Sequence, residues 1–519
     1  MTSYQTPPSR LLPREPNFFL AILPAMDWIV SLIPEATDDP ISAIADPPSG
    51  ASIVELRLDL FPGIDVATAV RACPVPILAT LRSQAEGGHG PVDPAVRSRI
   101  IREAREAGAT LLDLEFQRDF ELRRSLGLAP EQTILSWHDP TCTPESLPTI
   151  ADQMMESQAR WIKIVPTADT MRDMISVLAL HRRFNGGRRS SRRLLTFAMG
   201  VPGLASRYLA PLLGPPIGYG AWTDDAPAAP GQLSIDRTEV VIGHLGGPPQ
   251  RIYGVVGADV SGSLSPVLHS AGYRNLALPY LLLPISIPEP EELADIFGPR
   301  STTAFDAVGL EARGWAVTTP YKEQAASAAD RHAPRVLRAG VANTLILGEQ
   351  SVTAENTDAD GIVGSLMSLG VNPQGRRAVV QGTGGAARGA AVGLDLGGAE
   401  VTLRGRAAER TRRTADAIGV TWCSQDDSVP TNAILVNATP VGGEPGENGP
   451  FSEAEIQSAV AVVDMVYGDH ETQLVARARE LEIPVADGRE VLLHQGIAQF
   501  AAFTQRVPPK EAMREALKR

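Results

Sequence analysis

The sequence has 519 residues, of which 43% are hydrophobic and 21% charged, and its formal net charge is −13. That length exceeds one ordinary hydrophobic core and predicts two or more domains. No apolar run approaches the roughly 20 residues that cross a bilayer. The negative charge argues against a nucleic-acid or membrane-surface partner, so an anionic substrate would need local arginines.

Three scattered cysteines predict neither a disulfide framework nor a zinc site, and they fit a reducing cytoplasm. We expect no metal site. The first residues are polar and proline-bearing and lack a signal-peptide pattern, so we expect an amino-terminal extension over residues 1–24.

Short apolar runs then recur at intervals of a few tens of residues, with helical patterns such as 96–107 and 150–159 between most of them. Strands that alternate with helices predict an α/β fold, here a (β/α)8 barrel over residues 25–245, with an active site where the strands end. The expected strands are Trp28–Ile33, Ile53–Leu58, Ile77–Leu81, Leu111–Glu115, Ile134–His138, Trp161–Val165, Leu194–Ala198 and Ile217–Ala221.

Polar side chains lie in or just after these runs. Charged residues inside a strand weaken it, so their coincidence at one end of a barrel indicates function. They are Glu55, Arg57, Arg82, Asp113, Glu115, His138, Lys163 and Arg207.

Lys163 lies at the centre of one apolar run. A buried ammonium tends to lose its proton, and the free amine can form a Schiff base with a ketone. His138, expected to titrate near neutrality, could move protons at the adjacent carbon and at a departing hydroxyl. The three arginines could hold a carboxylate and polar substituents. These parts predict the imine-assisted dehydration of a hydroxylated keto acid. The alternative is that Lys163 reaches solvent from a half-exposed strand.

This half of the chain resembles the type I 3-dehydroquinate dehydratase family. The motifs that carry the resemblance are Glu55–Asp59, Thr80–Arg82, Glu86–Gly88, Ser136–Asp139 with Thr143-Pro144, Lys163, Met199-Gly200 with Ser206-Arg207, and Ala229–Gln232. The resemblance implies a Schiff-base role for Lys163, general acid/base work for His138 and an orienting role for Glu86. It implies substrate binding by Glu55, Arg57, Arg82, Arg207 and Gln232. One departure is Ala228, where the family usually has Ser, and we expect weaker binding or slower turnover from it.

Glycine and proline at 244–249 predict a linker, and Arg251–Val256 a new strand. Further on, a strand runs into Gly382-x-Gly384-x-x-Ala387 and a small-residue helix, the pattern of a dinucleotide site whose pyrophosphate meets the helix amides. After the next strand, Arg404-Gly-Arg406 replaces an acidic residue and favours the 2′-phosphate of NADP. We expect a substrate domain over 250–372, a Rossmann domain over 373–488 and helices over 489–519 that return to the substrate domain.

Lys322 and Asp358 form a candidate pair that shuttles a proton to or from a reacting hydroxyl while hydride moves at a nicotinamide. The second half resembles the shikimate dehydrogenase family through Ser263–Pro266, Val317–Lys322, Gly340–Thr344, Asn356–Asp358, Asn437–Pro440, Asp464–Tyr467, Gly488 and Leu492–Gln495. By resemblance Lys322 and Asp358 are catalytic. Substrate binding would fall to Ser263, Ser265, Thr318, Asn343, Tyr467 and Gln495. NADP binding would fall to Gly382, Gly384, Gly385, Ala386, Arg404, Arg406, Thr439, Met465 and Gly488.

Three positions depart from this second family: Gly262, Ala316 and Gly405. The order of the two halves resembles the bifunctional dehydratase–dehydrogenases of the shikimate pathway. The small-molecule partners would then be 3-dehydroquinate, 3-dehydroshikimate and shikimate. The alternatives are a dehydrogenase carrying a non-catalytic barrel, a class I aldolase in the barrel, and a quinate dehydrogenase in the second half.

Overall fold

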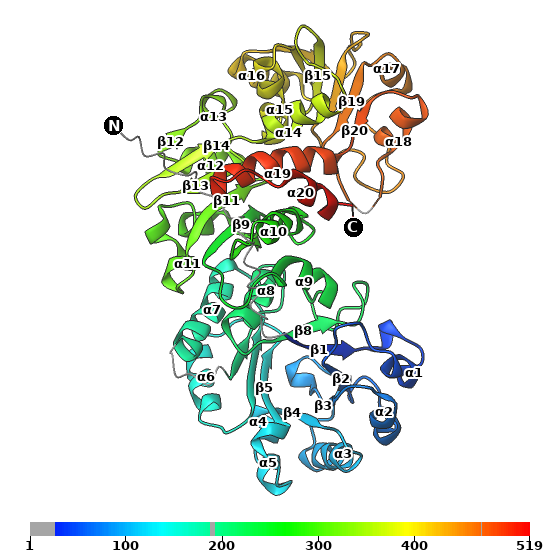
Figure 1. Cartoon of the computed structure of the whole chain (residues 1–519), viewed down its shortest axis with the longest axis vertical. Helices are drawn as coiled ribbons and strands as arrows, with labels where there is room; N and C mark the ends of the chain where they lie inside the picture. Colours follow the sequence, from blue (N-terminus) through cyan, green and yellow to red (C-terminus); the bar gives the residue numbers. More distant parts are fainter. Residues whose placement is uncertain (1–25, 187–192, 469, 519) are drawn as a thin grey trace, which may run out of the picture.

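The computed structural model describes residues 26–186, 193–468 and 470–518, so the expected extension over 1–24 lies outside the described residues. Figure 1 shows a barrel at one end of the molecule and two further lobes at the other. The described residues contain no helix with the length and apolar character that a membrane span requires.

The first half is a parallel barrel, as the sequence predicted. Its strands follow the order β7-β6-β5-β4-β3-β2-β1-β8, and β1 pairs with both β2 and β8. The strands are β1 (Asp27–Leu32), β2 (Ile53–Arg57), β3 (Ile77–Thr80), β4 (Leu111–Glu115), β5 (Thr133–Asp139), β6 (Trp161–Pro166), β7 (Leu194–Thr196) and β8 (Ile217–Ala221). The helices are α1 (Pro40–Ala45), α2 (Val66–Ala72), α3 (Pro94–Glu106), α4 (Phe116–Asp119), α5 (Leu122–Ser125), α6 (Leu147–Met155), α7 (Met171–Asn185), α8 (Leu204–Leu213) and α9 (Ile235–Ile242).

The barrel interior is divided into an apolar layer and a polar layer. Side chains alternate along a strand, so residues two apart share a face. The apolar layer contains Ile29, Ile53, Leu78, Leu111, Ile134, Trp161, Leu195 and Ile217. Two residues further along lies a second, mostly polar layer, which contains Ser31, Glu55, Thr80, Asp113, Ser136, Lys163 and Tyr219, with the apolar Phe197 just after β7 at the eighth position. Lys163 therefore projects into the barrel, directly above its apolar floor.

The second half begins with a six-stranded mixed sheet of order β10-β9-β11-β13-β14-β12. Its strands are β9 (Arg251–Gly257), β10 (Tyr280–Ser286), β11 (Ala312–Val317), β12 (Arg331–His332), β13 (Thr344–Leu347) and β14 (Val352–Glu355). Its helices are α10 (Ser265–Asn275), α11 (Ala304–Ala307), α12 (Lys322–Ala328), α13 (Pro334–Ala339) and α14 (Asp358–Ser368).

The last lobe has a parallel sheet of order β17-β16-β15-β18-β19-β20, the doubly wound order of a dinucleotide-binding fold. Its elements are β15 (Arg377–Gln381), α15 (Gly385–Leu396), β16 (Glu400–Gly405), α16 (Ala408–Ile418), β17 (Thr421–Ser424), β18 (Ile434–Asn437), α17 (Glu453–Gln457), β19 (Ala461–Asp464), α18 (Gln473–Glu480) and β20 (Val485–Ala486). The chain then returns through α19 (Gly488–Thr504) and α20 (Lys510–Ala516), which pack with α10 and α14 (Figure 1).

The barrel and the mixed sheet share one hydrophobic cluster, which includes Met174 and Leu178 of α7 and Leu283 of β10. Polar contacts also cross this boundary. Glu292, which is 2% exposed, accepts hydrogen bonds from the backbone N–H groups of Met171 and Arg172 at 3.1 and 2.9 Å. The second half therefore caps the first turn of α7, the barrel helix that follows the strand of Lys163.

Candidate active sites

Eight of the barrel residues singled out from the sequence line one pocket of about 280 Å³, whereas Asp113 and Glu115 are not part of its lining. Its lining also includes Ala228, together with Ser31, Thr80, Phe197 and Tyr219, which the sequence analysis did not assign to the site. The i, i+2 alternation from Ile29, Leu78, Leu195 and Ile217 is the signal that would have found these four. The predicted residues in the lining are Glu55, Arg57, Arg82, Glu86, His138, Lys163, Arg207 and Gln232.

Lys163 is buried between carboxylates and an aromatic ring. Its Nζ lies 3.9 Å from Glu55 Oε1, 3.9 Å from Asp113 Oδ2 and 3.9 Å from the centroid of the Tyr219 ring. Burial lowers the pKa of the Lys163 ammonium, and the two carboxylates oppose that shift only in part. The side chain is therefore held inside the barrel in an environment that favours the free amine.

His138 is held by Glu86. Glu86 Oε2 accepts a hydrogen bond from the His138 backbone N–H and lies 3.1 Å from ring Nδ1. Burial lowers the pKa of His138 well below 6.5, and the positive charges of Arg82, Lys163 and Arg57 lower it further. The expectation that His138 titrates near neutrality is therefore wrong for this structure, because the sequence showed neither the burial of the ring, which is the largest cause of the shift, nor the three cations around it. A neutral imidazole is ready to accept a proton.

Arg82 lies behind this pair in a cluster of acids. Its guanidinium donates to Asp113 Oδ1 at 3.0 Å, to Ser136 Oγ at 2.9 Å and to Glu86 Oε2 at 3.1 Å. Burial raises the pKa of Glu86 to about 8, because the positive charge of Arg82 offsets the effect of burial only in part. Much of the donor capacity of Arg82 is thus used to organise the acids around His138.

The other two arginines have different surroundings. Arg57 forms a two-point ion pair with Asp59, at 2.8 Å from Nε and 2.7 Å from the terminal nitrogen. Arg207 donates to the Pro230 carbonyl and lies over the Phe197 ring, while its buried Nε has no hydrogen-bond partner among the described residues. Burial lowers the pKa of Arg207 to about 10. A half-buried guanidinium with an unused donor suits an incoming carboxylate.

Gln232 is fixed by the backbone beside it, because its Oε1 accepts a hydrogen bond from Ala228 N–H at 2.8 Å. The position where the resemblance expects a serine hydroxyl therefore still contributes a main-chain contact to this loop.

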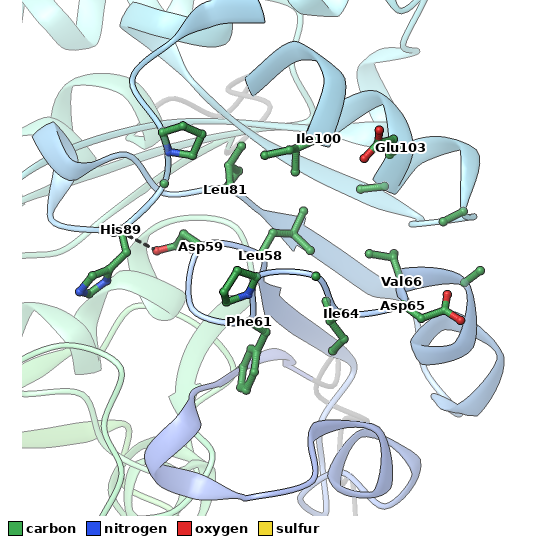
Figure 2. Close-up of a pocket in the computed structure, with 17 residues that line it drawn as sticks. Leu58, Asp59, Phe61, Ile64, Asp65, Val66, Leu81, His89, Ile100 and Glu103 are labelled. Atoms are coloured by element: carbon green, nitrogen blue, oxygen red, sulfur yellow. Dashed lines mark hydrogen bonds between the residues drawn. The ribbon is translucent and has the colours of Figure 1, made fainter. Parts of the chain in front are cut away.

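A larger hollow of about 380 Å³ lies outside the barrel, between the loop after β2 and helix α3 (Figure 2). Most of its lining is apolar, and it contains neither Lys163 nor His138. Its wall includes Asp59, whose Oδ2 accepts a hydrogen bond from the His89 backbone N–H at 3.1 Å (Figure 2). Asp59 thus links this hollow to Arg57, but the chemistry-bearing side chains lie in the smaller pocket.

In the second half, Lys322 and Asp358 are in direct contact, with Lys322 Nζ 2.5 Å from Asp358 Oδ2. Asn343 Nδ2 donates to Asp358 Oδ1 at 2.9 Å and to Gln495 Oε1 at 3.1 Å, so β13, α14 and α19 supply one buried network. Gln499, which the sequence analysis missed, supports it from α19 by donating to the Asn343 carbonyl and to Thr344 Oγ1. The four predicted residues at this place thus form one connected group.

The other predicted substrate residues lie at the start of α10 (Ser263 and Ser265), just after β11 (Thr318) and after β19 (Tyr467). Ser263 Oγ accepts a hydrogen bond from Ser265 N–H at 3.2 Å, and Ser263 is also hydrogen-bonded to the Tyr467 side chain. Thr318 is half-buried just after β11. At the departure Gly262 a Cβ would meet nothing within 4 Å, whereas Ala316 is buried in the core between α10 and α19.

The glycine loop lies directly against Lys322. A Cβ on Gly385 would lie 3.1 Å from Lys322 Cβ and Cδ. Gly382 has φ +124°, a conformation that L side chains rarely adopt, and its Cβ would meet the Ala438 carbonyl and Thr439 at 3.1 Å. A Cβ on Gly384 would meet nothing within 4 Å, so this side of the loop is open at the amino end of the 12-residue helix α15. This geometry fits a pyrophosphate bound by backbone amides.

The two arginines after β16 have different environments. Arg406 is exposed, whereas Arg404 is 6% exposed, donates to the Gln425 carbonyl at 2.7 Å and pairs with Glu455 at 2.9 Å. Arg404 is thus paired inside the lobe, while its Nε and Nη1 have no hydrogen-bond partner among the described residues, and its expected cofactor role stays a prediction. The local packing explains the glycine at position 405, because a Cβ there would lie 2.5 Å from Thr411 Oγ1.

The remaining predicted cofactor residues border the same lobe. Ala386 is half-buried in the first turn of α15, and Met465 is partly buried just after β19. Gly488 begins α19, where a Cβ would lie 2.3 Å from the Val466 carbonyl. No cluster of three or more His, Cys, Asp or Glu able to hold a metal ion occurs within residues 26–186, 193–468 and 470–518.

Fold and sites together define a two-centre enzyme, with an amine-bearing barrel joined to a two-lobed oxidoreductase. The family model of type I 3-dehydroquinase matches residues 29–246. The shikimate dehydrogenase substrate binding domain matches residues 255–345, and the shikimate 5′-dehydrogenase C-terminal domain matches residues 488–518.

Three known proteins illustrate the similarity. A chloroplastic bifunctional 3-dehydroquinate dehydratase/shikimate dehydrogenase of Arabidopsis thaliana is 28% identical over 493 residues, covering 89% of this chain and 79% of the relative. A shikimate dehydrogenase (NADP(+)) of Halorubrum lacusprofundi is 35% identical over 277 residues, covering 51% of this chain and 98% of the relative. A crystal structure of shikimate 5-dehydrogenase from Thermus thermophilus with NADP(H) and shikimate matches with TM-score 0.47 and 28% identity, covering 52% and 98% of the two chains.

The chain belongs to the shikimate dehydrogenase family through its second half and carries a type I 3-dehydroquinase domain in its first, which makes it a bifunctional 3-dehydroquinate dehydratase/shikimate dehydrogenase. It therefore combines a lyase and an oxidoreductase of the shikimate pathway, and both act on small molecules.

Proposed function

We propose that Lys163 forms an imine with the ketone of 3-dehydroquinate and that this imine drives loss of water to 3-dehydroshikimate. The proposal rests above all on the convergence of Lys163, His138 and Arg207 in one pocket of about 280 Å³. The burial of Lys163 supports it further, because burial lowers the pKa of the ammonium and so eases the loss of the proton that must leave before the amine can attack.

His138 is the group that moves protons at the substrate. Its Nδ1 contacts Glu86, so Nε2 is the ring nitrogen that removes a proton from the carbon next to the imine. The same nitrogen then returns the proton to the departing hydroxyl. Arg207 and Gln232 hold the substrate carboxylate, while Arg57, Arg82 and Glu55 hold its hydroxyl groups.

In the second half we propose that Lys322 and Asp358 hold and move the proton of the reacting oxygen as 3-dehydroshikimate becomes shikimate. Ser263, Ser265, Thr318, Asn343, Tyr467 and Gln495 bind the ring substituents and carboxylate. NADP(H), when bound, supplies the hydride. Gly382, Gly384, Gly385 and Ala386 would receive its pyrophosphate, Arg406 its 2′-phosphate, and Thr439, Met465 and Gly488 would border its nicotinamide half.

Two assays test this function. Borohydride added to the protein with 3-dehydroquinate should fix an adduct on the peptide that carries Lys163, as mass spectrometry would reveal. Absence of the adduct would favour a dehydrogenase whose barrel is a non-catalytic scaffold. A coupled assay should show NADPH consumption on addition of 3-dehydroquinate alone, and comparison of quinate with shikimate oxidation tests the choice of second substrate.

We further propose that the domain boundaries follow the expected ranges, and that the enzyme works in the cytoplasm without nucleic-acid or membrane partners. The three cysteines are free, which fits a reducing compartment, although the Arabidopsis relative is described as chloroplastic. Cell fractionation tests the location, and separate expression of 25–245 and 250–519 tests the main boundary.

A further inference from the structure

Two carboxylates lie equally close to Lys163, but only one has a free oxygen. Both oxygens of Glu55 are used: Oε1 accepts from Thr80 Oγ1 at 2.8 Å, and Oε2 accepts from Ser31 Oγ at 2.6 Å. Asp113 Oδ1 accepts from Arg82 and from Ser136 Oγ. Asp113 Oδ2, 3.9 Å from Lys163 Nζ, is buried and accepts no hydrogen bond from any described residue.

A buried carboxylate oxygen without a donor is costly, so its retention in the barrel needs an explanation. Asp113 is 3% exposed, and its free oxygen is on the side of Lys163. The cost of burying this oxygen without a donor is explained if Asp113 Oδ2 accepts a proton from Lys163 during the reaction.

The neighbouring groups are less suited to this task. The Tyr219 hydroxyl is also buried without a partner, but burial and the charges of Glu55 and Asp113 raise its pKa well above 10, so it stays protonated and cannot accept a proton. His138 is needed at the substrate carbon, and its Nδ1 is already engaged by Glu86.

We infer that Asp113 Oδ2 is the proton acceptor that converts the Lys163 ammonium into the amine that attacks the substrate ketone. This inference rests on the proposed Schiff-base role of Lys163. The separation of 3.9 Å would close by side-chain movement or through one water, as is common for catalytic contacts in a substrate-free site.

The protons balance over the sequence of steps. Lys163–NH3⁺ gives one proton to the Asp113 carboxylate, leaving an amine and a carboxylic acid. The amine adds to the carbonyl carbon, and one of its remaining protons moves to the new alkoxide, giving a neutral carbinolamine. The C–O bond then breaks, the Asp113 acid protonates the leaving hydroxyl, water departs and a protonated imine remains. Asp113 is thereby returned to its carboxylate form, and His138 stays free for the carbon-bound proton.

The test is the pH dependence of borohydride trapping with the full-length Asp113→Asn variant at saturating 3-dehydroquinate. If Asp113 accepts the proton, trapping of Lys163 should slow about 100-fold at pH 7, as expected for loss of a proton acceptor. If Asp113 merely stabilises the ammonium by its charge, Asp113→Asn should instead make trapping of Lys163 faster at low pH. Removal of the charge then lowers the pKa of Lys163, and the trapping profile shifts to lower pH without loss of maximal rate.

Shikimate oxidation by the second half and the melting temperature report folding of the same samples. If Asp113→Asn does not fold, Asp113→Glu carries the test, because it keeps the charge beside Arg82 but displaces the free oxygen. It should slow trapping at least tenfold. A rate equal to that of the unsubstituted protein in the folded variant overturns the inference. Failure of the proposed function would show differently, as absence of adduct in the unsubstituted protein.

Discussion

Glu86 contacts His138 twice, since its Oε2 accepts the backbone N–H and lies 3.1 Å from ring Nδ1. The same oxygen accepts from Arg82 at 3.1 Å. One carboxylate oxygen therefore connects the buried guanidinium to the imidazole and fixes which ring nitrogen faces the pocket.

This relationship predicts the behaviour of Glu86→Gln. A glutamine amide can donate to Nδ1, which would leave the hydrogen on Nε2 and remove the base. We expect kcat for dehydration to fall at least about tenfold, within the usual range for general base catalysis, with KM changed less than about threefold. The pKa of Glu86 is about 8, so the carboxylate that accepts Nδ1–H becomes populated as pH rises towards that value.

In the unsubstituted protein kcat should therefore increase with pH up to about 8, and the variant should lose this rise. Initial rates of 3-dehydroshikimate formation between pH 6 and 9 check this, with shikimate oxidation as the internal control. A variant that keeps the same rise would show that another group is responsible.

Substitution of the two lysines should separate the two activities. Lys163→Ala should lower dehydration by at least about 100-fold because no other lysine lines the pocket among the described residues, while reduction of 3-dehydroshikimate changes less than about twofold. Lys322→Ala or Asp358→Ala should do the reverse. Steady-state assays of each half-reaction on each variant decide the matter, and loss of both activities from one substitution would contradict independent sites.

Arg406 and Arg404 provide a matched pair for the cofactor site. Arg406→Ala should raise KM for NADPH about 10- to 100-fold, the equivalent of one charge-assisted hydrogen bond, and leave KM for NADH little changed. Arg404→Ala should leave the preference intact but destabilise the lobe by about 3 kcal/mol, because it leaves Glu455 without its partner. Kinetics with both cofactors and urea unfolding measure these effects. A change in the preference for NADPH over NADH in the Arg404 variant would support the cofactor-binding role expected for Arg404 from the sequence.

His269 should make the second half sensitive to acid. It is fully buried beside Tyr273, Phe500 and Phe503, and burial lowers its pKa to about 4. Between pH 6.5 and 4 the unfolded chain binds a proton that the folded chain does not, so stability falls as pH falls through this window. A shift of this size corresponds to ~3 kcal/mol at its full extent.

His269→Leu should flatten the dependence of melting temperature on pH in that range, whereas substitution of the exposed His470 by Gln should not. Thermal unfolding at pH 7, 6 and 5 provides the comparison. If melting temperature depends equally on pH in the unsubstituted protein and in both variants, groups other than His269 cause the acid sensitivity.

The strands were predictable because β-branched and leucine-rich runs are bounded by turns, and each expected barrel strand overlaps an observed one. The limits differ where tertiary contacts decide them: β7 ends at Thr196 rather than Ala198, and β5 continues to Asp139. The position of Lys163 inside the barrel was predicted from its apolar neighbours together with the polar residues at the ends of the other strands, because an apolar run alone is equally compatible with a lysine that reaches solvent. Ser31 and Tyr219 are uncharged, so only their i, i+2 relation to Ile29 and Ile217 could have identified them as residues of the site.

Other features depend on partners far apart in the sequence. The burial of Arg404 depends on Glu455, 51 positions later, and the low pKa of His138 depends first on burial of the ring and then on cations from β2, β6 and the loop after β3. The free oxygen of Asp113 is visible only when every nearby donor has been placed. The motifs therefore identified which residues form each site, whereas the charge states of those residues could be inferred only from the folded structure.

The cap that Glu292 places on α7 has a consequence for how such a fusion can evolve. In a freestanding barrel these two main-chain amides would lose their protein acceptor and bind water instead, and the apolar side of α7 would be exposed. The apolar cluster includes residues of both halves, so gene fission would expose apolar surface on the lyase and on the reductase. A split pair of enzymes would therefore need polar substitutions on both sides of the former boundary.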